Sequence, residues 1–242
     1  MLSLIGFGAF AVTCLVIGVR LALLARKTGQ LPEAAMAVAF LGAGAFGNTL
    51  GVLASLGVGG EAAHAPLQAI SRAASVAGSL ALYGFTWRVF RRTSRVAAMA
   101  FGAGLAVQLY TWLGHAWVFG LGADMVSLAW WWPLIIGRSA AYLWAGTEAF
   151  QYWRKMQRRR ALGLADPMTT QRFFLWGCGA CAAFGIFAIV MTRTAVTGDL
   201  TPSQLTRDAA SLLGLVAAVF IWTAFFPPAA YARWIERRAV RA

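Results

Sequence analysis

The sequence predicts an all-α integral membrane protein, folded as one seven-helix bundle with its N-terminus outside and its C-terminus in the cytoplasm. The chain of 242 residues is 60% hydrophobic and only 12% charged, which departs from the composition of soluble proteins. Seven apolar stretches are each long enough to cross a hydrocarbon core of ~30 Å. Basic clusters follow the first, third, fifth and seventh stretches, while the other connections carry acids.

The charges predict the orientation. Because cytoplasmic loops of membrane proteins are enriched in lysine and arginine, the basic connections are assigned to the cytoplasm. Glu61, Asp124 and Asp199 lie in the opposite connections. The four basic clusters are Arg26 and Lys27; Arg88, Arg91, Arg92 and Arg95; Arg154, Lys155, Arg158, Arg159, Arg160 and Arg172; and Arg233, Arg237, Arg238 and Arg241. We therefore expect a multi-pass protein of the inner (plasma) membrane.

The whole chain, 1–242, is predicted to be a single membrane domain. The predicted spans cover residues 2–25, 34–59, 66–90, 96–119, 126–153, 173–194 and 209–231. The first lacks the preceding positive charge of a cleaved signal peptide. The second follows Pro32-Glu33, and both residues suit a helix start. Glycines within the second, fourth and sixth spans, including Gly42 and Gly102, predict close helix packing.

Two cytoplasmic features extend beyond these spans. The fifth helix is predicted to continue past the membrane until a break near Gly163. Pro227-Pro228 predicts a kink or an end in the seventh span, because each proline removes a hydrogen-bond donor. The tail is predicted to lie on the membrane as an amphipathic helix, with Trp234 and Ile235 toward lipid and its arginines toward anionic headgroups. The net charge of +13 is thereby explained without a nucleic-acid partner.

Arg138 is the clearest polar residue at membrane depth. It lies about ten residues, or roughly 15 Å, below the outer end of the fifth span. A charge there is costly, so it is expected to face the bundle interior, a water cavity or an acidic ligand. Neutral polar residues at similar depths complete a predicted ligand-binding centre: Asn48, Gln108, Tyr110 and Thr111. The alternative is a structural arginine satisfied by backbone carbonyls and these neutral groups.

Glu148 is the one carboxylate well inside an apolar stretch. It lies ten residues beyond Arg138 on the same predicted helix, too far away to pair with it. Arg20 and Arg88 lie at the same level near the cytoplasmic side, so an inner polar cluster with an ion pair is predicted. The alternative role for Glu148 is proton relay.

No cofactor is predicted. The two histidines, His64 and His115, both belong to the outer half and are weak candidates for a zinc site or for axial ligation of haem b. A non-covalent pigment pocket lined by tryptophans is a further alternative. Each is outweighed by a simpler reading, because a lone histidine in each of two segments is weak evidence for a metal and tryptophans gather by default at membrane interfaces.

The arrangement of seven helices with an external N-terminus resembles that of rhodopsins and G-protein-coupled receptors. This resemblance concerns topology over the length of the chain. Retinal proteins need a Schiff-base lysine in the seventh span, but the only lysines are Lys27 and Lys155, both in cytoplasmic connections. Covalently bound retinal is therefore excluded.

We expect a non-catalytic, receptor-like or sensor-like protein that binds a small or lipidic ligand within the bundle. The sequence contains no hydrolase triad motif, phosphate-binding loop or metalloprotease helix. One alternative is a transporter or channel with a polar path through Arg138. Another is an accessory subunit that binds haem or pigment in a larger membrane complex. A receptor predicts a closed pocket, whereas a transporter predicts a continuous polar track.

Overall fold

The computed structural model describes residues 2–240, apart from the side chains of residues 2–4, 236, 239 and 240, and within that range the chain is helical without any strand. The elements are α1 (Leu2–Thr28), α2 (Leu31–Val38), the π-helix η1 (Ala39–Gly47), α3 (Asn48–Ser55), α4 (Glu61–Phe90), α5 (Arg95–Phe119), α6 (Leu128–Ala161), α7 (Pro167–Thr197), α8 (Gln204–Phe225) and α9 (Ala229–Val240). Elements α2, η1 and α3 follow one another without a break and form one long segment.

Within residues 2–240, five segments are long and apolar enough to cross a membrane, which supports a multi-pass helical membrane protein. They are Ile5–Thr28, Leu31–Ser55, Arg95–Phe119, Pro167–Thr197 and Gln204–Phe225. Helices α4 and α6, with 30 and 34 residues, are also long, but buried polar side chains such as Arg72 and Glu148 make them more polar. Each predicted span overlaps one of these seven long segments.

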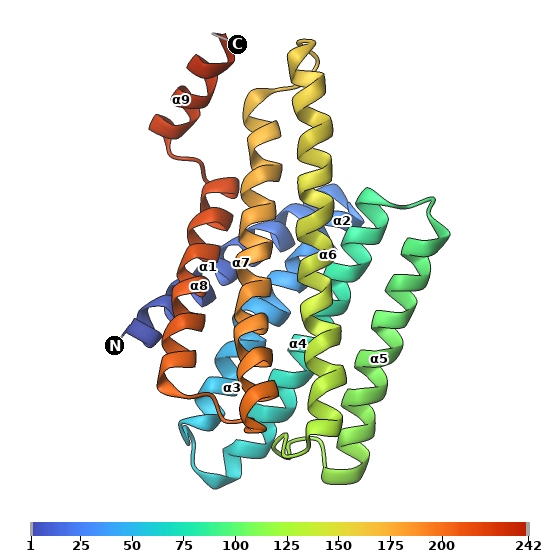
Figure 1. Ribbon diagram of the computed structural model, residues 1–242, viewed down its shortest axis with the longest axis vertical. Coiled ribbons are helices and arrows are strands. Elements are labelled where there is room, and N and C mark those ends of the chain that lie inside the picture. The colour runs from blue at the N-terminus through green and yellow to red at the C-terminus, as the bar shows by residue number, and fades with distance from the viewer. Residues whose placement is uncertain (1, 241–242) are drawn as a thin grey trace.

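The helices form a closed bundle. Successive long segments pack against each other, and α1 packs against α8, so the first and last long helices complete the ring. Helices α8, α7, α6 and α5 lie side by side, while α1 and the α2–η1–α3 segment cross behind them at a steep tilt (Figure 1). Helix α5 packs against α4 and α6 and lies at one edge of the bundle (Figure 1).

Local sequence signals account for several helix ends. Asp166 caps α7 by accepting a hydrogen bond from the Thr169 backbone N–H at 2.6 Å, and this bond holds the pKa of the Asp166 carboxyl below its ordinary value. At the other end of α7, Gly198 adopts φ +68°, a left-handed conformation in which a Cβ would be strained.

The structure corrects two predicted boundaries. The second span ends at Ser55 rather than residue 59 and contains the π-helix, which the sequence did not reveal. The seventh ends at Phe225, because Phe226 leaves the helical conformation ahead of Pro227-Pro228, and α9 starts afresh at Ala229. The extension of the fifth predicted helix is present, since α6 continues to Ala161.

The tail also differs in part from its prediction. Helix α9 stands beyond the end of α8, and it contacts α7 (Figure 1). Arg238 lies over the Trp234 ring at 4.1 Å, and Trp234 is exposed. Ile235, however, is buried rather than turned toward lipid. Its burial follows from the contact with the bundle, which covers one side of the helix.

Candidate functional site

A cavity of about 110 Å³ lies between α1, the α2–η1–α3 segment, α4, α6 and α7, and we call it the central cavity. Its wall has a polar part and an apolar part. The polar wall comprises Asn48, Ser75, Ser79, Arg138 and Tyr142, and the apolar wall comprises Phe10, Ala43, Ala183, Ile186 and Phe187. A small ligand with one charged end and one apolar end matches this division.

Arg138 provides the positive charge of the central cavity. Its Nε and Nη2 atoms are buried and make no hydrogen bond, and no ion pair between described residues includes it. Tyr142 follows one helical turn later on α6 and lines the same cavity. Because an unpaired buried charge is costly, these free donors are suited to an anionic group.

Gln108 and Thr111 are fully buried and face the interior from α5, but neither lines the central cavity. Ser79, a wall residue, donates a hydrogen bond to Oε1 of Gln108, while Nε2 of Gln108 has no partner. The Thr111 hydroxyl donates to the Val107 carbonyl of its own helix at 2.6 Å. Of the predicted centre, Asn48 thus lines the same cavity as Arg138, and Gln108 accepts a hydrogen bond from a residue of its wall.

Tyr110 lies apart from this group. Its side chain is 71% exposed, and its ring lies 5.7 Å from that of Trp130 on the surface. Residues at i and i+3 share a helix face, so Gln108 and Thr111 point inward together, whereas Tyr110 is displaced by more than a quarter turn. Tyr110 therefore points away from Gln108 and Thr111, although the three residues lie within one turn of the same helix.

Arg72 is a buried cation that the sequence analysis did not single out. It is 8% exposed on α4, and its Nη1 lies 3.5 Å from Nδ1 of His115. It interacts electrostatically with Asp124 and with Arg138, so two buried guanidinium groups share this half of the bundle. The available signal was a charge six residues inside the predicted third span.

The two histidines lie at the acidic end of the bundle. The His64 ring has partners on both nitrogens, with the Ala54 carbonyl at 3.2 Å and the Asp124 carboxylate at 3.2 Å. His115 is 2% exposed, and its Nε2 has no partner. No group of three metal-ligating side chains occurs in the described part of the chain. The weak metal prediction gains no support from this arrangement.

The inner polar cluster has a different membership from the predicted one. Nε of Arg91 donates to both carboxylate oxygens of Glu148, at 2.8 and 3.0 Å. The same arginine donates from Nη2 to Gln151 at 2.6 Å, and Trp144 donates to Glu148 at 3.3 Å. An ion pair was expected here, but its cation is Arg91, at the C-cap of α4.

Arg20 and Arg88, the two predicted cations, do not pair with Glu148 in the structure. Arg20 donates to the Phe225 carbonyl at 3.4 Å and lies over the Phe226 ring at 4.6 Å, which ties α1 to the end of α8. Arg88 is exposed. Residue depth alone could not distinguish among these cations, because the direction of each side chain around its helix decides the partner.

No protein-family model, curated protein or solved structure matches the chain.

Proposed function

We propose that this is a non-catalytic, receptor-like membrane protein that binds a ligand carrying an anionic group in the central cavity. In this proposal all seven long segments cross the membrane, with the N-terminus outside and the basic end in the cytoplasm. The proposal depends on one observation above all: Arg138 presents buried, unpaired donors to a cavity that also contains an amide and two serine hydroxyls.

A carboxylate fits this wall chemically. A guanidinium group offers parallel N–H donors that match the two oxygens of a carboxylate, and such charge-assisted bonds are the stronger class. Asn48 and Ser75 can donate to the remaining lone pairs from α3 and α4. Nearby Arg72 raises the positive potential further, which favours an anion over a neutral ligand.

The distribution of polar groups favours a receptor over a channel for hydrated ions. A channel needs polar groups along its whole path. Between the central cavity and the basic end, the interior is instead lined by Phe40, Leu82 and Ile221. A polar site bounded by such residues retains a ligand rather than conducting an ion.

Thermal unfolding in nanodiscs of neutral lipid tests the proposal. Acetate, propionate and phosphate should be compared with the matching uncharged amides. Carboxylates should raise the unfolding midpoint, because a ligand that binds only the folded state stabilises it by mass action. Arg138→Leu should remove this shift without lowering the midpoint of the ligand-free protein, since no partner of Arg138 is lost.

Arg88→Leu is the matched control, because Arg88 is an exposed arginine outside the cavity. This variant should retain the full carboxylate shift. The proposal fails if amides stabilise as well as carboxylates, or if Arg138→Leu retains the shift. A cavity that holds only water gives no shift with any of these compounds.

A further inference from the structure

Three cavities lie in a row within the bundle, and neighbouring ones share wall residues. The second, which we call the apolar chamber, has a volume of about 30 Å³ and shares Phe10, Tyr142 and Ala183 with the central cavity. The third, the basic-end cavity, has a volume of about 400 Å³ and shares Met36 and Trp176 with the apolar chamber. The row therefore extends from Arg138 to the basic end of the molecule.

One face of α7 lines the whole row. Its residues recur at spacings of three and four, which places them on a single helical stripe: Phe173, Trp176, Ala180, Ala183 and Phe187. The stripe corresponds to about 21 Å of helix at 1.5 Å per residue. This length suits an extended chain rather than a compact ligand.

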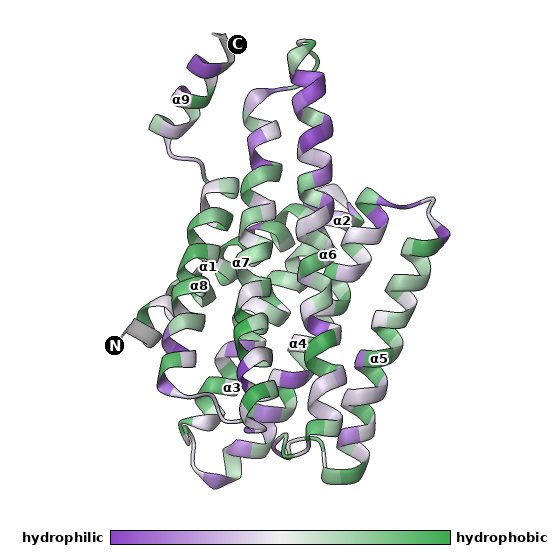
Figure 2. Ribbon diagram, viewed as in Figure 1, coloured by the Kyte–Doolittle hydropathy of each residue, from purple (hydrophilic) through white to green (hydrophobic). Residues whose placement is uncertain are grey.

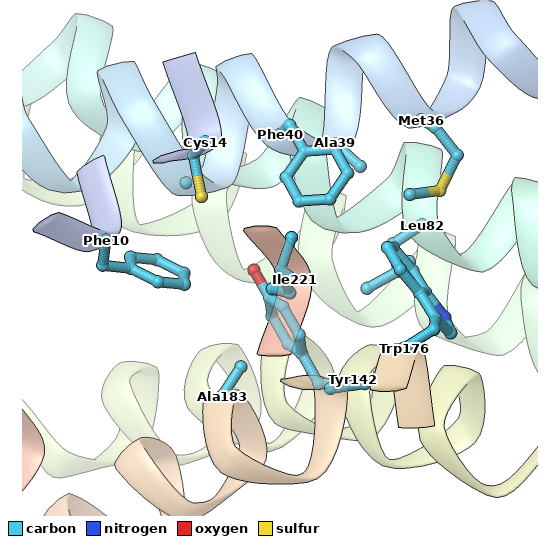
Figure 3. A pocket seen from close by; sticks show the side chains of 12 residues that line it. Phe10, Cys14, Met36, Ala39, Phe40, Leu82, Tyr142, Trp176, Ala183 and Ile221 are labelled. Carbon is cyan, nitrogen blue, oxygen red and sulfur yellow. The ribbon is translucent and has the colours of Figure 1, made fainter. Parts of the chain in front are cut away.

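The apolar chamber is narrow and lacks charged residues. Side chains from several helices point into it, among them Phe40, Tyr142 and Trp176 (Figure 3). The Phe40 and Trp176 rings meet edge to face at a centroid distance of 5.7 Å. Cys14 and Met36 add soft sulfur groups to the wall, and a flexible Met can yield to a passing chain. So narrow an apolar space selects one slender apolar chain over two chains or a ring system.

The basic-end cavity is aromatic, and its cations are less available than Arg138. Its wall includes Phe85, Phe90 and Phe173. Arg20 lies at this cavity but already binds the Phe225 carbonyl and the Phe226 ring, and Arg172 is exposed to solvent. An anionic headgroup is therefore bound more strongly in the central cavity, where the donors of Arg138 are buried and unused.

We propose that the ligand is a single-chain carboxylic acid whose carboxylate binds Arg138 and whose alkyl chain extends through the apolar chamber into the basic-end cavity. This inference rests on the proposed function and names the ligand class for the same site. The central cavity is polar, the apolar chamber is narrow and the basic-end cavity is aromatic. This order matches the headgroup, the chain and the chain end of such a molecule.

Quenching of tryptophan fluorescence by bromine tests the position of the chain. The protein in nanodiscs of unbrominated phosphatidylcholine is titrated with dodecanoic acid brominated either at its terminal carbon or next to the carboxylate. The terminal bromine should give saturable quenching that Trp176→Phe abolishes, because Trp176 lines both the apolar chamber and the basic-end cavity. The bromine next to the carboxylate should leave the Trp176 emission unchanged while the acid still competes for binding.

Two variants control this measurement. Trp222→Phe removes an exposed tryptophan of α8 and should leave the saturable quenching intact, since that residue reports only on acid dissolved in the bilayer. Arg138→Gln should raise the half-saturating concentration by about tenfold or more, the loss expected for a hydrogen bond to a charged group. Dodecanol, which lacks the charge, should bind equally weakly to both proteins.

Ala180→Leu should separate chain binding from headgroup binding, because Ala180 lines the apolar chamber but not the central cavity. Saturable quenching by the terminally brominated dodecanoic acid should be lost, whereas stabilisation by acetate should remain. If acetate stabilises the parent protein but dodecanoate never gives Trp176-dependent quenching, the long-chain inference is overturned and the proposed function stands. If only the bromine next to the carboxylate quenches Trp176, the headgroup lies at the basic end, as for a membrane phospholipid, and the inference is likewise overturned. If acetate does not stabilise the protein and neither brominated dodecanoic acid binds, both proposals fail.

Discussion

At the scale of single residues, Arg88 and Arg91 differ by three positions, yet only Arg91 reaches Glu148. Arg88 lies in the last turn of α4 and is exposed. Arg91 is the C-cap residue, and its φ of −139° turns the chain away from the helix axis, so its side chain points across to α6. A residue just outside a helix thus makes a contact that the helical periodicity of the sequence does not describe.

Arg91→Ala should lower the free energy of unfolding by about 1–3 kcal/mol, because it leaves the carboxylate of Glu148 buried without its cation. Arg88→Ala should change it by less than about 0.5 kcal/mol, as expected for an exposed side chain. Unfolding by SDS in mixed micelles measures both. In a double-mutant cycle with Glu148→Gln, additive effects of the two substitutions would contradict the pairing.

At the scale of elements, η1 and α4 approach so closely that their backbones touch. A Cβ added at Gly42 would lie 2.6 Å from the Ala74 carbonyl oxygen, and one at Gly78 would lie 2.2 Å from the Ala43 nitrogen. Small residues permit such contacts between helices in membranes. The wider π-helical turn occurs in the segment that contributes Ala39, Phe40 and Gly44 to the apolar chamber, consistent with the frequent location of π-turns at functional sites.

Gly78→Ala should therefore destabilise the protein by about 1–3 kcal/mol, because the neighbouring atoms belong to the backbone and cannot rotate away. Gly102→Ala on α5 is the matched control: nothing lies within 4 Å of an added Cβ, so alanine should be neutral or stabilising by up to about 1 kcal/mol. The same SDS titration measures both variants. Equal effects would mean that η1 and α4 do not pack as closely as described.

At the scale of the whole molecule, the charges divide the bundle into two ends. Hydrophilic residues concentrate on the upper part of α6 and at the turn between α4 and α5, whereas α5 and α8 are largely apolar along their lengths (Figure 2). Asp124 and Asp199 lie at the opposite end. Asp199 follows Gly198, the C-cap residue of α7, and pairs with Arg193 at 2.9 Å. This division underlies the proposed orientation.

Single cysteines should reveal that orientation in a background with Cys14, Cys178 and Cys181 replaced by alanine. A cysteine at Gly60 or Gly198 should react with an impermeant maleimide added to intact cells. One at Gly163, in the turn between α6 and α7, should react only after the membrane is opened. The three positions are exposed turn glycines, so accessibility within the protein is matched. The reverse pattern would overturn the orientation and the depth assigned to Arg138.

The helical class and the approximate extent of the long helices could be predicted from the sequence, because length, apolar content and charge are properties of continuous segments. Which polar groups meet is set by the tertiary structure. The fold places Asn48 and Arg138 in the wall of one cavity, turns Tyr110 to the surface and pairs Glu148 with Arg91, since each outcome depends on how a helix is rotated and tilted against its neighbours. It also aligns residues of α1, α2, η1, α3, α4, α6, α7 and α8 around one row of cavities, an arrangement to which distant parts of the sequence contribute jointly.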